Sequence, residues 1–223
     1  MGDSVEQCLA GELRDRTCFG QILIRRAHGG PFVLCHRDDE NCDRLENSRN
    51  PELAADLARY DDRGNYRPLK TTPDLRHGWR LEVVDLGELR RALDYFYPGR
   101  LAVLAAWKNS RLTTTPLRET LNRQSGMYRV AAKISDPQID EVVGRFCRSD
   151  GGCLRTILWK RDAIGTNPSA NLPREKFDPR FDQTTAPREL GSTTPATNAI
   201  PLLCQEACNL LVNECRKAVK GEV

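Results

Sequence analysis

Nine cysteines divide this chain of 223 residues into two cysteine-containing regions, and they constrain its fold more than any other feature. Four lie between residues 8 and 42, five lie between residues 147 and 215, and the interval between these groups contains none. The start, M-G-D-S-V-E-Q-C, has neither the basic segment nor the apolar stretch of an export signal. An odd number of cysteines without such a signal fits a reducing compartment better than closed disulfides. We therefore expect a cytoplasmic protein that uses cysteine to bind metal.

Four of the five C-terminal cysteines form two local pairs, Cys147-x5-Cys153 and Cys204-x3-Cys208. An iron-sulfur cubane needs four thiolates that converge on one small object. The glycines of R-S-D-G-G, between the first two cysteines, let the backbone fold closely around a ligand. The segment 202–220 has helical periodicity, so the second pair is expected on one helix face, a turn apart. We predict that Cys147, Cys153, Cys204 and Cys208 bind one [4Fe-4S] cluster as cofactor and metal ligands.

Cys215 as a ligand, zinc in place of a cluster, and cysteines that bind no metal are the alternatives to this ligand set. Cys215 follows Cys208 by seven residues, and two helical turns rise by about 10.5 Å, which is too far for neighbouring thiolates on one cubane. Four cysteines in two pairs can also hold zinc, but zinc pairs prefer a C-x2-4-C spacing and the x5 pair falls outside it. The spacing is similar to that of the cluster ligands of sulfite and nitrite reductases. The pair spacing therefore favours an iron-sulfur cluster over zinc. The helical rise argues against Cys215 as a ligand, unless the helix breaks after Cys208.

Hydrophobic periodicity predicts an α+β fold. A mixed domain at 1–136 is expected to precede a small, mostly helical, cysteine-rich module at 137–223. The run 101–107 fits a core strand or a core helix equally well, and Pro-containing dipeptides predict a long irregular loop at 161–200. Helices are predicted at 4–15, 51–60, 86–96, 115–122, 137–146 and 202–220, a hairpin at 19–26 and 32–37, and a strand at 78–84.

Composition excludes several classes of function. The net charge is only +3 and the two signs are mixed along the chain, so charge gives no reason to expect nucleic acid. No stretch approaches the roughly 20 apolar residues that cross a bilayer, so no membrane is expected. The sequence contains no P-loop, G-x-G-x-x-G, H-E-x-x-H or G-x-S-x-G motif, which removes support for nucleotide or nucleophilic chemistry.

Two weaker groups remain, and each has a plainer interpretation. Cys18, Cys35, His36 and Cys42 could form a second metal site, but Cys35 continues the apolar alternation of its strand and fits a core position. Arg67, Lys70, Arg76 and Arg80 could bind the carboxylates of a tetrapyrrole, although solvated surface is the favoured interpretation. The residues alone assign no role to Cys8.

Several segments, together with the two cysteine pairs, resemble a small bacterial family. They are F-G-Q-I-L-I-R at 19–25, L-C-H-R-D-D at 34–39, G-N-Y-R-P-L-K-T at 64–71, L-R-H-G-W at 75–79, Y-F-Y-P at 95–98 and R-Q-S-G-M-Y-R at 123–129. Members of that family join a stabilising domain to a [4Fe-4S]-binding domain. Longer members carry both behind a sirohydrochlorin cobaltochelatase domain of cobalamin synthesis.

The resemblance implies a cluster-binding accessory protein, redox or structural, of cobalamin or sirohaem synthesis. A cobaltochelatase, another enzyme of the pathway or a tetrapyrrole is then the implied partner. No chelatase domain precedes residue 19, and His28, His36 and His77 lie inside the stabilising region, so catalytic roles are not carried over. A tetrapyrrole-acting chelatase or reductase and a zinc-stabilised interaction module remain the alternatives.

Overall fold

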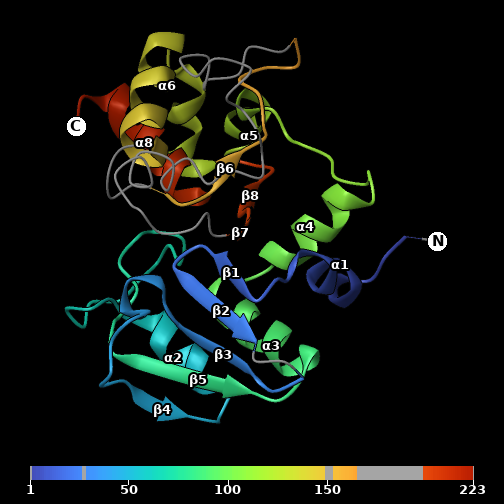
Figure 1. Cartoon of the computed structure of the whole chain (residues 1–223). Coiled ribbons are helices and arrows are strands. Elements are labelled where there is room, and N and C mark those ends of the chain that lie inside the picture. The colour runs from blue at the N-terminus through green and yellow to red at the C-terminus, as the bar shows by residue number, and fades with distance from the viewer. Residues whose placement is uncertain (1, 27–28, 149–152, 165–197, 223) are drawn as a thin grey trace.

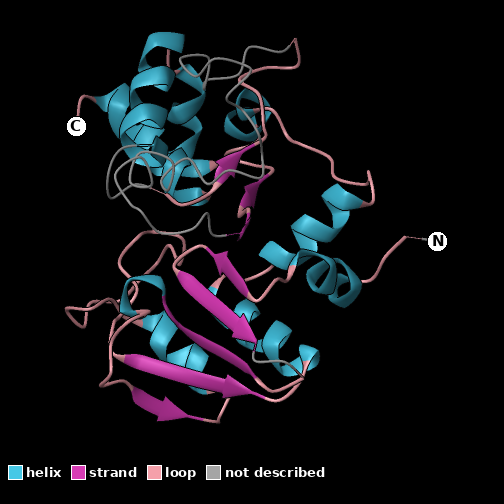
Figure 2. Cartoon of the chain, in the orientation of Figure 1, coloured by secondary structure: helices cyan, strands magenta, loops and turns pink. Residues whose placement is uncertain are grey.

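The computed structural model describes residues 2–26, 29–148, 153–164 and 198–222. Its centre is a six-stranded sheet with the order β4-β5-β3-β2-β1-β7 (Figures 1 and 2). The inner pairs are antiparallel, whereas β4 with β5 and β1 with β7 are parallel. The strands are β1 (Arg16–Phe19), β2 (Ile22–Arg26), β3 (Phe32–His36), β4 (Glu46–Ser48), β5 (Trp79–Val83) and β7 (Asn198–Ile200).

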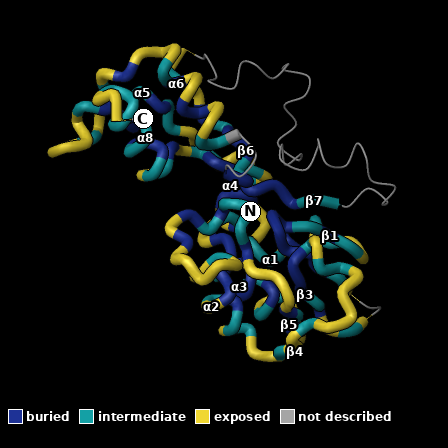
Figure 3. The backbone as a smooth tube through the Cα atoms, turned by 90° about the vertical axis from the view of Figure 1, so that its left-hand side faces the viewer, coloured by how far each residue is buried: buried dark blue, intermediate teal, exposed yellow. Residues whose placement is uncertain are grey.

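The predicted hairpin and the predicted strand at 78–84 correspond to β2, β3 and β5, but the predicted first strand, 19–26, starts too early, because Phe19 ends β1 and β2 begins at Ile22. Alternation along β5 buries Trp79, Leu81 and Val83 on the core side. Figure 3 shows β3 as mostly buried, whereas β4 at the edge of the sheet is mostly exposed. The turn from β1 to β2 needs Gly20, because its φ is +60° and a Cβ there would lie 2.6 Å from the Tyr97 ring.

Four helices pack with this sheet around a first hydrophobic core: α1 (Val5–Glu12), α2 (Leu53–Arg59), α3 (Leu86–Phe96) and α4 (Arg100–Lys108). Ser4 caps α1 in a reciprocal arrangement with Gln7, and the Asp85 carboxylate caps α3 by accepting the Glu88 N–H at 2.8 Å. The structure resolves the ambiguous run 101–107 as part of helix α4.

A second core lies among α5 (Leu117–Asn122), the 3-10 segment η2 (Gly126–Lys133), α6 (Asp136–Val143) and α8 (Asn209–Lys220). Trp159 is fully buried in it. The molecule is thus α+β, with a sheet-containing N-terminal part followed by a mostly helical C-terminal part, as predicted. The domain boundary between 136 and 137 stays a prediction, and most of the predicted loop, 165–197, lies outside the described residues.

A short parallel sheet connects the two cores. Its strands are β6 (Thr156–Ile157) and β8 (Leu203–Cys204), and Ile157 lies opposite Cys204. Leu203 packs in the first core, whereas Cys204 packs in the second, because neighbouring residues of a strand point to opposite faces. This sheet therefore places one predicted ligand at the boundary between the cores.

The predicted helix over 202–220 is wrong at its start. Helix α8 begins at Asn209, with Cys208 as its N-cap, and Leu203 and Cys204 belong to a strand instead. Pairing with β6 is the physical reason, because the Thr156 N–H donates to the Leu202 carbonyl and the Leu158 N–H donates to the Cys204 carbonyl, at 2.8 and 2.9 Å. Among the described residues, no helix has the length and apolar character to cross a bilayer.

Candidate metal centre

The four predicted cysteines line one small pocket in the second core. Each comes from a different local structure. Cys147 lies on a π-helical turn, η3 (Gly144–Arg148), and Cys153 precedes β6. Cys204 lies on β8, and Cys208 is the N-cap of α8. The helix-face argument for the second pair fails, yet the fold still brings all four thiols to one place.

Local geometry explains how two of these thiols reach the pocket. The π-helical turn that continues α6 is wider than an α-helical turn, and such turns occur often at functional sites. At the start of α8, the Cys208 sulfur accepts the Leu211 N–H at 3.5 Å, so this side chain occupies the capping position. The Cys208 sulfur therefore lies where backbone N–H groups and the helix dipole favour a negative charge.

Residues from the N-terminal part of the chain reach the pocket as well. The Thr71 hydroxyl lies 3.2 Å from the Cys153 sulfur, and the Thr71 carbonyl accepts the Leu154 N–H at 2.7 Å. Burial raises the pKa of the Cys153 thiol above its ordinary value, whereas the Arg155 guanidinium and the Thr71 hydrogen bond act in the opposite direction. Thr71 is thus positioned to donate to this sulfur when it is a thiolate.

Two arginines place positive charge beside the cysteines. Arg155 lines the pocket, and Arg100 donates to the Leu203 carbonyl at 2.8 Å. Burial, and then the like charge of Arg155, lower the pKa of Arg100, while Cys204 and Cys153 act to raise it. An anionic group held by the cysteines would therefore offset the repulsion between the two guanidinium groups.

Two pocket-lining residues also carry buried N–H groups that have no hydrogen-bond partner within the described part of the chain. They are the Nε of Arg155 and the Nε1 of Trp159. A buried donor without an acceptor costs about 1–3 kcal/mol, so such groups call for an explanation. Four thiolates with iron and sulfide would supply acceptor sulfur atoms and negative charge here. The residues present fit such a group.

Cys215 lies outside this pocket. It is 0% exposed, packs in the second core, and is not among the residues that line the pocket with the other cysteines. Burial raises its pKa to about 12, which keeps the sulfur protonated. Its exclusion from the ligand set stays a prediction, with core packing now as its physical basis.

The basic residues considered for a tetrapyrrole differ in their exposure. Arg67 is only 2% exposed, and its guanidinium donates to the Asp74 carboxylate at 2.7 Å and to the Lys70 and Thr72 carbonyls at 2.8 and 3.0 Å. It braces its own loop, so solvated surface was the wrong interpretation for this residue. Arg76 is exposed and Arg80 is half-buried. Arg67 is therefore not available to a tetrapyrrole carboxylate, and a role for the other three side chains stays a prediction.

The second metal site considered at Cys18, Cys35, His36 and Cys42 is not assembled either. Cys35 is 7% exposed and lies on the face of β3 opposite to Phe32 and Leu34, which pack in the first core, whereas Cys42 is exposed. No three of these four residues bring ligand atoms within 4.8 Å of one another, and all four are described. Cys35 is therefore buried, as the favoured interpretation expected, but it is not part of either hydrophobic core.

Two family models divide the chain between them. Residues 7–111 match the DR2241 stabilising domain, and residues 109–217 match a 4Fe-4S iron-sulfur cluster binding domain. Each part of the chain is thus similar to one of these two domains, and they follow one another in the order that the family resemblance implies. The domain at 109–217 contains all four predicted ligands as well as Cys215.

A solved structure agrees with this family. The chain is 27% identical to DR2241 from Deinococcus radiodurans, with a TM-score of 0.71. That protein is described as multi-domain, with structural similarity to chelatases and two additional novel domains. The match covers 97% of this chain and 41% of that protein, so this chain spans less than half of its relative's length. No protein in the curated collection searched matches the chain.

Three residues around the pocket were missed by the sequence analysis: Thr71, Arg100 and Arg155. The first two belong to segments far from any cysteine ligand in sequence, so no local spacing could indicate them. Arg155 did leave a signal, because it interrupts the otherwise apolar run L-R-T-I-L-W. A charged residue inside such a run is a reason to search for a buried partner.

Proposed function

We propose that this protein binds a single [4Fe-4S] cluster through Cys147, Cys153, Cys204 and Cys208, and that it acts as an accessory to metal insertion into tetrapyrroles. The single observation that carries the proposal is the common pocket of these four thiols within a domain of the 4Fe-4S binding family. A bound cluster supplies one-electron chemistry or a covalent cross-link between protein segments.

The spacing of the sulfur atoms supports a cluster over zinc. Ligands held at 2.3 Å on one tetrahedral zinc ion lie about 3.8 Å apart. Among the described residues, no three cysteine sulfurs of the pocket lie within 4.8 Å of one another. The described thiols are therefore not gathered as closely as the ligands of a single tetrahedral zinc ion.

The chelatase link rests on the relative in Deinococcus radiodurans. Its structural similarity to chelatases is described alongside two additional domains, and this chain covers 41% of its length. We propose that the segment shared with this chain corresponds to the additional domains, which would act with a chelatase. Insertion of cobalt into sirohydrochlorin is the reaction that the family resemblance implies.

The protein's own residues have definable tasks in this proposal. Arg100 and Arg155 balance the negative charge of four thiolates, and Thr71 donates to the Cys153 sulfur. Trp159 fills the adjacent core and keeps water away from the site. These contacts are the levers that set a cluster potential: charge, hydrogen bonds to sulfur, and burial.

The proposal is tested with the full chain purified without oxygen. We expect a brown protein with a reversible one-electron couple, and we expect it to change the rate at which a separate sirohydrochlorin cobaltochelatase inserts Co²⁺. Cys153→Ser should abolish both effects. A cluster without a reversible couple would leave a structural role. Failure to bind either the chelatase or sirohydrochlorin would contradict the accessory role.

A further inference from the structure

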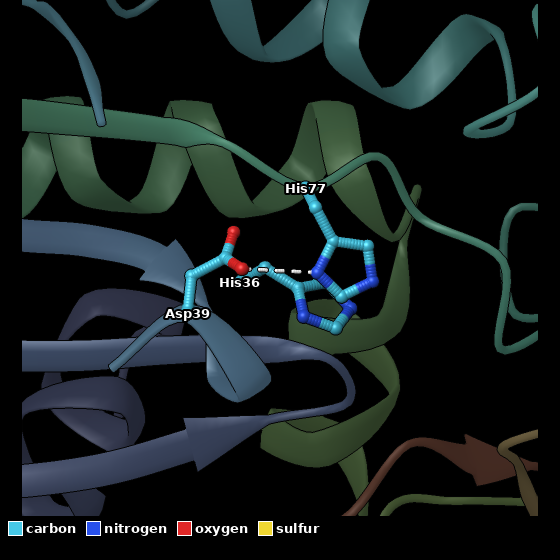
Figure 4. Close-up of side chains that lie close together, drawn as sticks. All are labelled: His36, Asp39 and His77. Carbon is cyan, nitrogen blue, oxygen red and sulfur yellow. Dashed lines mark hydrogen bonds and ion pairs between the residues drawn. The ribbon is translucent and has the colours of Figure 1, made fainter. Parts of the chain in front are cut away.

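Away from the cysteine pocket, His36, Asp39 and His77 converge at one end of the central sheet (Figure 4). His36 is the last residue of β3, Asp39 ends the 3-10 turn η1 (Arg37–Asp39), and His77 precedes β5. One ligand atom from each side chain lies within 4.8 Å of the other two. Among the His, Cys, Asp and Glu side chains of the described residues, no other group of three brings its ligand atoms this close together.

Asp39 is held in place from two sides. One carboxylate oxygen lies 3.0 Å from His77 Nδ1, and the other accepts the Gly78 N–H at 2.7 Å. The Asp39 side chain is 12% exposed. Carboxylates that bind metal are commonly oriented by such a second hydrogen bond, which leaves one oxygen available to the ion.

His36 is also fixed by its surroundings. Its side chain is 1% exposed, and the Gln21 side-chain amide lies 3.1 Å from Nε2. Gln21 is held in turn by the Leu75 N–H, which donates to Gln21 Oε1 at 3.1 Å. The other ring nitrogen, Nδ1, accepts the Asp38 N–H at 3.2 Å.

The remaining side of the group is open and negatively charged. The two imidazole rings lie 3.9 Å apart between centroids, and the His77 side chain is 49% exposed, so water can reach the site. The Asp38 carboxylate lies 3.8 Å from His36 Nδ1. Asp38 and Asp39 together outweigh the nearby guanidinium of Arg37, which lies 3.8 Å from Asp38. The local charge therefore favours a cation.

We propose that His36, Asp39 and His77 bind one divalent transition-metal ion of the zinc type, with water completing its coordination. Two imidazoles and a carboxylate suit zinc, cobalt, nickel or ferrous iron, whereas magnesium and calcium prefer an all-oxygen site. This site uses none of the cysteines, so it does not depend on the proposed cluster. The chain then carries two metal centres of different chemistry.

The test is a calorimetric titration of the anaerobic, cluster-loaded full chain with Zn²⁺. The visible spectrum is followed in parallel, so that displacement of iron from the cysteines is detected separately. We expect one high-affinity Zn²⁺ per chain with an unchanged spectrum. His77→Ala and Asp39→Asn should each weaken binding at least about 10-fold, since even outer-shell changes have effects of that size.

Asp56→Asn is the matched control, because this carboxylate is exposed on α2 and should leave Zn²⁺ affinity unchanged. The half-exposed His77 can be replaced with little effect on folding, and an unchanged melting temperature would verify this. Absence of high-affinity Zn²⁺ binding in the wild type would overturn the proposal. Equal affinities of the wild type and a folded His77→Ala variant would overturn it as well.

Discussion

At the scale of single residues, Thr71 links the two parts of the chain at the proposed cluster. Its hydroxyl lies 3.2 Å from the Cys153 sulfur although 82 residues separate them in sequence. Hydrogen bonds to cluster sulfurs stabilise the more negative, reduced state and so raise the reduction potential. We therefore expect Thr71→Val to retain the cluster but lower its midpoint potential, measured by redox titration, and to lower stability by about 1 kcal/mol.

Thr113→Val is the control for this change, because Thr113 is exposed. It should leave both the potential and the stability of the wild type intact. A Thr71→Val protein with the wild-type potential would show that the hydroxyl does not act on the cluster.

A second residue-scale prediction concerns the acid side of the stability curve. Glu40 accepts from Arg16 of β1 and Arg25 of β2, and these bonds, Arg16 foremost, hold the pKa of Glu40 below its ordinary value of 4.5. Because the folded-state pKa is depressed, this contribution is present above about pH 4.5 and is lost as the pH falls through the folded-state pKa.

Glu40→Gln should therefore lower the free energy of unfolding by about 1 kcal/mol at pH 7, measured by urea denaturation. The difference between the two proteins should shrink steadily as the pH falls below 4.5. A difference that stays constant from pH 7 to pH 3 would argue against the carboxylate as its source.

At the scale of elements, Cys208 has two roles at the start of α8: it is the N-cap of the helix and a proposed cluster ligand. A substitution can test the two roles separately. Serine is a good N-cap but a poor ligand for iron, so Cys208→Ser should keep the helix and lose the cluster. We expect the Cys208→Ser variant to have the same far-ultraviolet circular dichroism as the cluster-free wild type. Its visible absorption should be lost. Retention of a wild-type cluster in Cys208→Ser would remove Cys208 from the ligand set.

Cys215→Ala is the matched variant on the same helix. It should retain the absorption and lower stability by about 1 kcal/mol, because it removes one buried sulfur from the second core. Bleaching of Cys215→Ala while Cys208→Ala stays brown would invert the assignment of the two cysteines.

Much of the element pattern is predictable from this sequence, and the exceptions have physical causes. Helix α3 was predicted with both ends correct, because Asp85 supplies a cap and Tyr97-Pro98-Gly99 ends the helical pattern. Helix α8 was predicted to start too early, because the apolar residues within 202–208 also fit helical spacing. Only the pairing with β6, which lies far away in sequence, decides for a strand.

The residues of the candidate site could be predicted from the sequence only where they lie close together along the chain. Local spacing was enough to propose four cysteines, since short pairs are visible in sequence. Thr71 and Arg100 come from the N-terminal part, and His77 lies in a different segment from His36 and Asp39. Such groupings depend on tertiary contacts, and periodicity contains no information about them.

At the scale of the whole molecule, the two cores share the β6–β8 sheet but carry different tasks. All four proposed ligands come from elements of the second core or its border, so ligation should stabilise that region most. We expect removal of the cluster with a chelator to increase hydrogen exchange in residues 136–148 and 198–222. Strands β2, β3 and β5 should stay protected, because their core contains none of the cysteines.

Uniform loss of protection over both cores would instead indicate one cooperative unit held together by the cluster. That result is consistent with a bound cluster but not with a self-sufficient N-terminal core. Hydrogen exchange followed by mass spectrometry distinguishes the two outcomes at the level of peptides.

The central claim is that four thiols in the second core hold a [4Fe-4S] cluster. Its most direct test is the count of iron, acid-labile sulfide and zinc per chain after purification without oxygen. We predict about four iron and four sulfide, as the cubane requires, with no zinc at the cysteines. The claim would be contradicted by a colourless protein that contains one zinc ion per chain and no sulfide. In that case the Cys153→Ala variant should contain no zinc.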